Sequence, residues 1–571
     1  MHDLVIRNAT VVDGSGDRPF VGDVAVDGEL IAEVGDDVGA GRREVDADGL
    51  LLTPGWVDIH SHYDGQATWD PHLVPSGAHG VTTTVFGNCG VGFAPAKAED
   101  RSALITIMEG VEDIPGAALW EGLTWDWETF PDYLDALEST GRSVDVAALL
   151  PHSAVRAYVM GAEPSIRGVA TDDQIDRMKT IVRDAVASGA FGLSTSRTKL
   201  HLGSDGKAVP GSFVELEELL ELAGAVRDGG GGIIQGVTDW TAGDPAREFA
   251  WFRRISQEFG LPVAFALVQD DQIPGNIYQV LDLLAEARAD GLDVHAGVGV
   301  RPVGMLINLE SEIHPLSGHP SYQEIASLPA DERVARMRDP EFKRRLLSED
   351  STITNSFWRP RLTNPAQMFV LGDPPEYEPG PERSVSHLAK EAGCSPDEYV
   401  YDFLVERGRS DWIMIPLFNY SDGDLAPQLD MMRHPETVIS LADGGAHCRL
   451  ICDASAPTYL LTHWVRDRDR GERLPLERAV QMQTQETAAA WGFTDRGEIR
   501  PGLRADLNLI DFDALRLLPP RWATDLPADG KRLLQDAEGY VATFQAGRQT
   551  WSDGSPTGVL PGRLVRGFGR R

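Results

Sequence analysis

His60 and His62 are separated by a single serine, and this spacing is suited to binding a metal ion. On an extended strand, side chains two residues apart point to the same face, so both imidazoles can approach one divalent cation. The preceding residues 51–59 form an apolar run with a Pro-Gly break, which indicates a strand that ends where the histidines begin. A bare His-x-His is common, but barrel enzymes carry their chemistry at this end of their strands, which favours a metal site.

Asp443 follows a second apolar run at residues 437–441 and could contribute a carboxylate to the same site. If this run is the last strand of a closed barrel and the histidine strand is the first, the two strands are neighbours. An aspartate before two glycines is by itself more often a turn residue. Beside the histidine pair, we expect Asp443 to reach both the metal and its water.

Cys89 lies just beyond an apolar strand at residues 81–86, in the segment Gly87-Asn88-Cys89-Gly90. The glycines allow a sharp turn and leave little bulk around the sulfur. A thiolate there would be a strong ligand for zinc. Its position alone is equally compatible with a small buried thiol.

The elements that must position these residues alternate between short apolar strands and helical stretches, a pattern typical of parallel β/α units. Helical patterns cover residues 171–188, 213–227 and 278–290, among others. The predicted strands cover residues 56–60, 81–86, 144–150, 191–195, 232–237, 262–268, 292–298 and 437–441. Eight such strands predict an α/β chain with a (β/α)8 TIM-like barrel over residues 56–494.

Both ends of the chain have a different pattern, in which short strands alternate apolar and polar residues between turns. We expect residues 1–55 and 495–571 to meet in one small β-sandwich domain. Residues of about 302–436 exceed a normal connection and contain charged helical runs such as 331–349, which indicates an insertion near the mouth of the barrel.

The composition of the 571 residues excludes several classes of protein. The net charge of −36 disfavours binding to nucleic acid or an anionic membrane surface, and no apolar stretch is long enough to span a bilayer. The first residues enter a strand pattern without a secretory leader, and the four cysteines show no paired spacing. We expect a cytoplasmic enzyme with a small-molecule substrate, and association of outer helices into a homo-oligomer stays open.

Four segments together resemble the amidohydrolase superfamily, and within it the N-acyl-D-amino-acid deacylase (D-aminoacylase) branch. The matching segments are PGWVDIHSH at 54–62, GVTTTVFGNCG at 80–90, ADG at 442–444 and GxIxPGxxADL at 497–507. The resemblance spans nearly the whole chain, and its Gly-Asn-Cys-Gly element is fairly specific to this branch. It implies a zinc-dependent barrel hydrolase in which His60, His62 and Asp443 share one metal site, with Cys89 as the sulfur ligand.

The chain departs from this branch at the fifth and sixth predicted strands, where members usually carry one histidine each. Neither strand contains a histidine here, and the nearest polar residues are Gln235, Asp239, Gln269 and Asp270. Amide oxygens are poor zinc ligands beside imidazole. We therefore expect one zinc ion per subunit.

A single zinc ion is chemically sufficient for hydrolysis of a C–N amide bond, as in an N-acyl amino acid or related carboxamide. The ion would activate water and polarise the carbonyl, with Asp443 as general base and then acid. The alternative on the same scaffold is a metal-dependent lyase or decarboxylase, because one ion can also stabilise an enolate-like intermediate. A non-catalytic protein on a decayed scaffold is disfavoured by the joint presence of all four site residues.

Further side chains near predicted strand ends are candidates for supporting roles. His152 could donate to the developing oxyanion or complete the metal shell, and we include it with Asp443 as catalytic. His295 and His447 are weaker candidates. Arg197 and Arg301 could recognise a substrate carboxylate through a two-pronged contact, and Gln269 could bind substrate at the end of the sixth strand.

Overall fold

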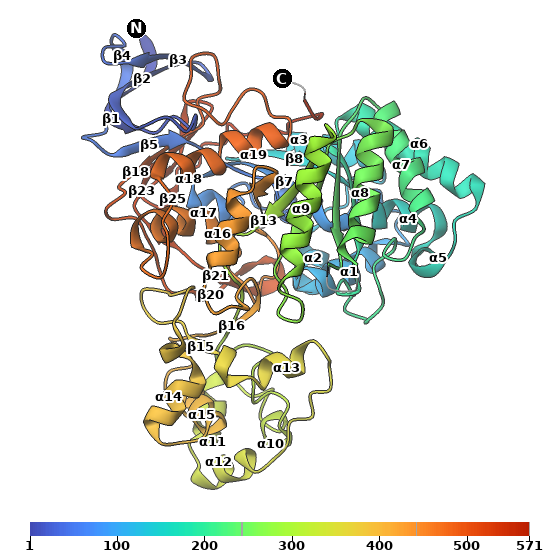
Figure 1. Cartoon of the computed structure of the whole chain (residues 1–571), viewed down its shortest axis with the longest axis vertical. Coiled ribbons are helices and arrows are strands. Elements are labelled where there is room, and N and C mark those ends of the chain that lie inside the picture. The colour runs from blue at the N-terminus through green and yellow to red at the C-terminus, as the bar shows by residue number, and fades with distance from the viewer. Residues whose placement is uncertain (241–243, 441, 570–571) are drawn as a thin grey trace.

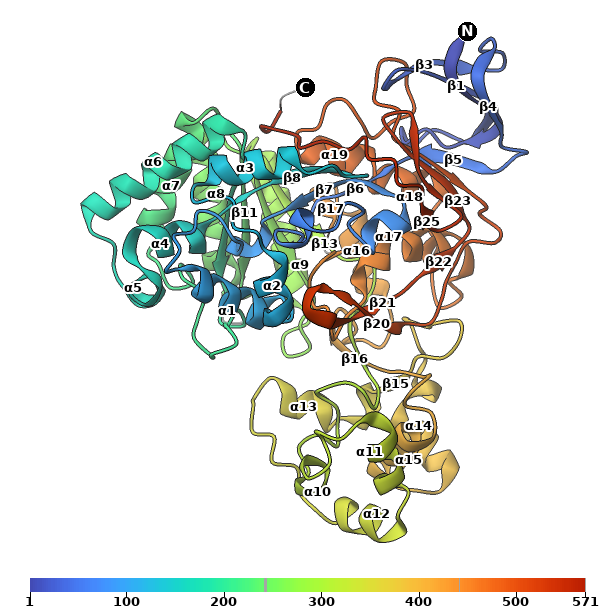
Figure 2. The same cartoon turned by 180° about the vertical axis from the view of Figure 1, so that it is seen from behind.

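The computed structural model describes residues 1–240, 244–440 and 442–569. Parallel strands and their helices form the centre of the molecule (Figure 1). A sheet built from both ends of the chain lies on one side, and a separate helical lobe extends from the central part. Figure 2 shows the same arrangement from behind, with the lobe joined to the centre at β15 and β16.

The central strands are all parallel and hydrogen-bonded in chain order, β6 to β7 to β8 and then β9 through β13 to β17. Only Leu149 separates β8 from β9, and its N–H donates to Phe86 O. A parallel bridge between Ser61 and Gly444, just beyond the ends of β6 and β17, joins the first strand to the last. The ring of strands is closed by this contact. The strands are β6 (Trp56–Asp58), β7 (Val81–Phe86), β8 (Asp145–Ala148), β9 (Leu150–Pro151), β10 (Gly192–Arg197), β11 (Ile233–Thr238), β12 (Val263–Leu267), β13 (Val294–Val298) and β17 (Thr437–Ile439).

These strands coincide with the eight predicted ones, the third being two short segments. The eighth was predicted to reach Leu441, which lies outside the described residues. All six residues of β7 are buried, which explains its continuous apolar and threonine-rich sequence, because helices and barrel interior cover both faces of a parallel strand.

Helices follow the strands and cover the barrel. Thr171 and Gln174 form a reciprocal capping box at the start of α6, and Gly189 in the left-handed region ends it. These helices are α1 (Arg101–Val111), α2 (Gly116–Gly122), α3 (Phe130–Ser139), α4 (His152–Met160), α5 (Ala162–Arg167), α6 (Asp172–Ser188), α7 (Leu216–Asp228), α8 (Pro245–Phe259), α9 (Asn276–Ala289), α16 (Ala426–Arg433), α17 (Ala456–Tyr459), η7 (Leu460–Asp467), α18 (Leu476–Met482) and α19 (Gln485–Ala490).

The two chain ends meet in one nine-stranded sheet with its own apolar core. β5 pairs with β1 in parallel and with β18 in antiparallel orientation, which joins the two ends. Residues 516–538 stay outside this sheet and form two small two-stranded sheets. Leu533 N in this segment donates a hydrogen bond to Cys448 O near the barrel mouth. The nine strands are β1 (His2–Val11), β2 (Phe20–Asp27), β3 (Leu30–Gly35), β4 (Gly41–Asp46), β5 (Leu51–Pro54), β18 (Leu507–Ile510), β23 (Tyr540–Gln545), β24 (Arg548–Ser552) and β25 (Ser555–Pro556).

The lobe arises between β13 and α16, within the predicted insertion. Its sheet joins β14 (Val303–Ile307), β15 (Phe369–Val370) and β16 (Ile413–Phe418), and its apolar residues form a core separate from that of the barrel. The charged run at 331–349 is two helices, because Asp339 caps a new helix that starts at Pro340. The lobe helices are α10 (Pro320–Gln323), α11 (Ala330–Met337), α12 (Pro340–Leu347), α13 (Trp358–Leu362), α14 (Val385–Ala392) and α15 (Pro396–Glu406).

Within the described part of the chain, every helix is too short or too polar to span a bilayer.

Candidate metal centre

His60 and His62 lie directly after β6 and are held from both sides. Ser61 N donates to Val85 O of the neighbouring strand at 3.1 Å, and His62 N donates to Gly444 O at 2.8 Å. The two imidazoles are 4% and 2% exposed, and their ring centroids are 5.4 Å apart. The predicted strand end therefore turns both rings into one buried space.

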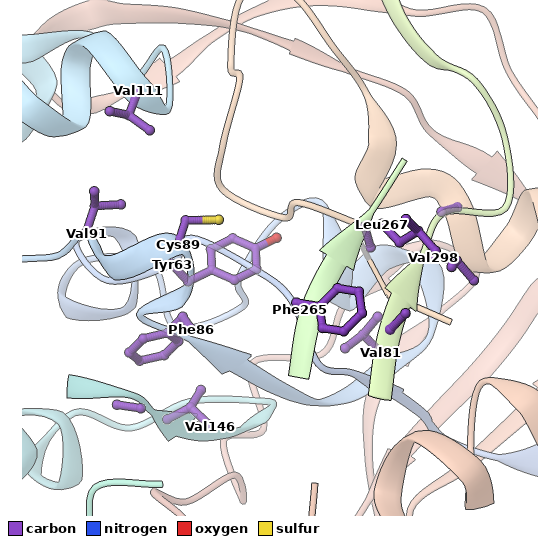
Figure 3. Packing of buried hydrophobic residues seen from close by; sticks show 14 of the residues in the cluster. Tyr63, Val81, Phe86, Cys89, Val91, Val111, Val146, Phe265, Leu267 and Val298 are labelled. Atoms are coloured by element: carbon purple, nitrogen blue, oxygen red, sulfur yellow. The ribbon is translucent and has the colours of Figure 1, made fainter. Parts of the chain in front are cut away.

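Cys89 joins this pair from the loop after β7. Its Sγ lies 3.3 Å from His60 Nε2, and one ligand atom from each of His60, His62 and Cys89 lies within 4.8 Å of the others. The backbone of Cys89 is left-handed, at φ 56°, and its N–H donates to Gln235 Oε1 at 2.9 Å. Figure 3 shows Cys89 with Phe86 and Val91 in the apolar cluster around the strand end.

Gly90 lies where the loop after β7 passes against the backbone of β10, so this position requires a glycine. A Cβ at this position would lie 2.7 Å from the backbone of Thr195 and Ser196, and its φ of 72° also disfavours other residues. The glycine thus lets the loop approach β10 closely enough to hold Cys89 over the barrel.

Asp443 reaches the same cluster from the chain beyond β17. Its Oδ1 lies 3.5 Å from His60 Nε2 and 3.9 Å from His62 Nε2, and its backbone N donates to His60 O. Its φ of 46° is in the left-handed region, which is a conformation that functional residues often adopt at a cost. The aspartate predicted as a ligand and base therefore lies beside both histidines.

The charges of these groups fit a cation. Burial and the neighbouring imidazoles lower the pKa of His60 to about 3, so its ring is neutral, as a metal ligand must be. Burial raises the pKa of the Cys89 thiol and of the Asp443 carboxyl well above their usual values. A divalent ion among these atoms would stabilise the thiolate and the carboxylate together. Two imidazoles, a thiolate and a carboxylate are a ligand set that suits zinc.

Glu112 joins the cluster although no sequence motif predicted it there. It follows α1, is 2% exposed, and places Oε1 3.4 Å from His62 Nδ1 and Oε2 3.9 Å from His447 Nε2. Burial raises its pKa well above the usual value, with Asp443 as a further cause. Its only sequence signal is a pair of acidic residues between apolar ones, in Val111-Glu112-Asp113-Ile114.

Two more histidines face the same space. His201 was not considered in the sequence analysis, and its Nδ1 lies 3.0 Å from Ser196 Oγ at the end of β10. His447, a weaker candidate from the sequence, also lines the space, and burial lowers the pKa of each ring to about 4.

The cluster opens into a cavity of about 170 Å³. Val237 and Val268 line it from the ends of β11 and β12, the two strands where histidines were absent. Val303 and Phe418 line it from the first and last strands of the lobe. Leu200, Trp240 and Ala266 add further apolar surface, whereas Asp239 and Asp270 add carboxylates.

His152, predicted to act beside the metal, does not line this cavity in the described structure. It is 1% exposed, and its ring bonds to Thr195 Oγ1 and Glu218 Oε1, each at 3.0 Å. Both ring nitrogens of His152 are therefore bonded within a buried network, in which Glu218 also pairs with Arg156. His295 likewise lies elsewhere and contacts Asp293.

The three predicted substrate-binding residues also have other partners. Arg197 donates to Val214 O and lies over the Trp251 ring. Arg301 is buried and bonds to Asp453 Oδ1 at 3.0 Å. Gln269 Nε2 donates to Asp422 Oδ2 at 3.1 Å. None of the three lines the cavity of the described structure, because each is drawn into contacts beside it.

Comparison with known proteins gives matches over almost the whole chain. The family described as Amidohydrolase family matches residues 43–557. D-aminoacylase of Alcaligenes xylosoxydans xylosoxydans is 27% identical, with 99% of this chain and 97% of that protein covered. N-acyl-D-aspartate deacylase of the same organism is also 27% identical, with 99% and 95% covered.

A solved structure of D-aminoacylase has a TM-score of 0.65 at 25% identity, and the match covers 99% of this chain and 100% of that chain. It is described as addressing the binuclear metal centre of that enzyme, with one-metal activation and second-metal attenuation. The likeness extends over the parallel strands, both chain ends and the lobe.

Proposed function

The chain belongs to the amidohydrolase family, and from this premise we propose that it is a zinc-dependent hydrolase that cleaves the C–N amide bond of a small N-acylated substrate. The resemblance to the D-aminoacylase branch is confirmed by the relatives. Since this fold hosts many activities, the proposal depends on the site and not on the fold alone.

The observation that carries the proposal is the convergence of four side chains from three strand ends. The ligand atoms of His60, His62 and Cys89 lie within 4.8 Å of one another, with Asp443 Oδ1 3.5 Å from His60 Nε2. These four residues would hold the ion. When bound, zinc lowers the pKa of water and polarises a carbonyl oxygen.

Asp443 supplies the proton transfers of the proposed reaction. Its carboxylate accepts a proton from water as the water oxygen bonds to the carbonyl carbon. It then returns that proton to the nitrogen as the C–N bond breaks, which yields a carboxylic acid and an amine. The apolar side chains Val237, Val268 and Phe418 line the same cavity and would lower the local dielectric constant around this carboxylate.

A single ion per subunit is part of the proposal. Val237 and Val268 stand at the ends of the two strands where the branch usually carries histidines, and a valine offers no donor atom. D-aminoacylase is described as activated by one metal, which supports a one-metal reaction in this chain.

The test is a screen of zinc-loaded protein with N-acyl amino acids of both hands and simple aryl amides, run beside Asp443→Asn. We expect amine and carboxylic acid in equal amounts, and a loss of about 100-fold or more in Asp443→Asn. A variant as active as the parent would remove Asp443 from the mechanism. Release of carbon dioxide or an unsaturated acid in place of an amine would favour the lyase or decarboxylase alternative.

A further inference from the structure

Four carboxylates line the cavity, and they come from four separate parts of the barrel rim. Glu112 follows α1, Asp239 follows β11, Asp270 follows β12 and Asp443 follows β17. Among the residues that the structure describes, no lysine or arginine lines the same cavity. The carboxyl groups are therefore spread over the whole rim, and Asp239 and Asp270 lie on it outside the proposed metal centre.

Arginine and lysine side chains lie near the cavity but have contacts outside its lining. Arg301 is bonded to Asp453, and Arg197 to Val214 O. Arg361 of the lobe lies near Asp270 and outside the cavity lining; it donates to two carbonyl oxygens and packs 3.9 Å from the centre of the Phe357 ring, and its Nε has no partner in the described structure. Lys199 lines a different hollow, together with Glu163 and Lys207.

Of the two rim carboxylates outside the proposed metal centre, Asp239 and Asp270, Asp270 has the free oxygen. Asp239 uses both oxygens, accepting from Thr198 Oγ1 and from Lys199 N. Asp270 accepts from Gln272 N through Oδ1 at 2.7 Å, and its Oδ2 has no hydrogen-bond donor within the described chain. This Oδ2 could accept a hydrogen bond from an ammonium or amide N–H of a substrate in the cavity.

The field of the whole chain acts in the same direction. A net charge of −36 gives a negative potential that lowers the local concentration of anions and raises that of cations. A substrate carboxylate would enter against this field and lose its hydration without a lysine or arginine of the cavity lining to pair with.

We propose that the cavity selects amides without a free carboxylate, namely N-acylated amines that are neutral or cationic, with Asp270 as the specificity residue. This rests on the proposed function, since it names the substrate class of the same site. The apolar residues Val237, Val268 and Phe418 contact the uncharged part of such a substrate, and Asp270 accepts from its polar end.

The test uses four probes that share an acetyl group: the two enantiomers of N-acetylphenylalanine, N-acetylphenethylamine and N-acetyl-1,4-diaminobutane. N-acetylphenethylamine is N-acetylphenylalanine without its carboxylate, and N-acetyl-1,4-diaminobutane carries a cation. We expect kcat/KM for the neutral or the cationic probe to exceed that of either N-acetylphenylalanine by about tenfold or more, as one unpaired charge near a carboxylate would cause. Equal or faster hydrolysis of an N-acetylphenylalanine would overturn the proposal.

Asp270→Asn separates the specificity role from general effects of charge. An asparagine keeps the acceptor for Gln272 N but removes the charge, so we expect the preference for the cationic probe to fall by about fivefold to tenfold. Asp271→Asn is the matched control, because Asp271 carries the same charge, accepts from Ser421 Oγ and lies outside the cavity lining. A preference unchanged in Asp270→Asn, or equally reduced in both variants, counts against Asp270.

The two proposals can fail separately. If the zinc-loaded protein hydrolyses amides but prefers the carboxylated probes, only the substrate class is wrong. If it hydrolyses none of the probes, the dissociation constants of the probes, measured by calorimetry on the same protein, test the charge selection. Tighter binding of the neutral or cationic probe would then support the charge selection while the hydrolase assignment falls, and equal or tighter binding of the carboxylates would overturn the selection as well.

Discussion

The Nδ1 atom of His62 and the Oε1 atom of Glu112 face each other at 3.4 Å, and both are buried without another hydrogen-bond partner in the described structure. A carboxylate beside one ring nitrogen holds the histidine in the tautomer whose other nitrogen carries a lone pair. The other nitrogen of His62, Nε2, is the one nearer Asp443. Glu112 is thus placed to position a ligand of the proposed ion from behind.

Replacing Glu112 by glutamine should weaken metal binding. Because carboxylate partners orient ligating imidazoles and raise their basicity, we expect a loss of about 10-fold to 100-fold in zinc affinity, measured by competition with a chromophoric chelator. Glu109→Gln is the control, since Glu109 lies one turn earlier in α1 and outside the cavity. Equal affinities in the two variants would show that Glu112 does not position His62.

Replacing Cys89 by serine should remove a sulfur ligand. A serine hydroxyl is a much weaker ligand than a thiolate, so we expect sulfur-to-cobalt charge-transfer absorption in the cobalt-loaded parent and its loss in the variant. Cys394→Ser should keep this absorption, because Cys394 lies in the lobe and outside the cluster. If the band persists in Cys89→Ser, the sulfur is not a ligand.

Replacing Phe418 by alanine should raise KM more than it lowers kcat. This side chain lines the cavity from the last strand of the lobe, and losing roughly 1.5 kcal/mol of apolar contact would raise KM about tenfold with kcat nearly unchanged. Phe357→Ala makes the same change in the same lobe, in a side chain that packs near Phe418 without lining the cavity. Steady-state kinetics on both variants check this, and an equal rise in KM would point to a general effect on the lobe.

Glu378 should stabilise the fold in a pH-dependent way. Burial acts to raise its pKa, but hydrogen bonds from His463, Arg468 and Leu425 N bring it down to about 2. A lowered pKa stabilises the folded state above the ordinary value of 4.5, and this stabilisation is lost as the pH falls from there toward 2. At pH 7 it corresponds to about 3 kcal/mol.

Urea unfolding of the parent and of Glu378→Gln measures this contribution. The difference between them should shrink as the pH falls from about 4.5 toward 2. Glu376→Gln serves as a neighbouring control outside the Arg468 pair. A difference that does not shrink below about pH 4.5 would contradict the assigned pKa.

The barrel strands could be predicted because their signals are local. Apolar runs such as β7 are buried on both faces, and the Thr171 capping box and Pro340 mark helix starts by chemistry that needs no distant contact. The shared orientation of His60 and His62 could be predicted for the same reason, since side chains two residues apart in an extended segment point to the same face.

Other parts of the site depended on contacts between segments far apart in the chain. Glu112 meets His62 only because α1 ends beside the barrel mouth, and His201 reaches the cavity through the loop beyond β10. His152, Arg197 and Arg301 stood near predicted strand ends but bond to Glu218, Val214 and Asp453 instead.

The sequence by itself determined which strand ends carry imidazole, sulfur and carboxylate, because short-range periodicity and glycine conformations set these. Only the tertiary structure decided which buried polar groups face one another. Burial makes an unpaired polar group costly, so each side chain is committed to whichever partner packing brings within a few ångströms, and that choice is made by long-range contacts that no local pattern encodes.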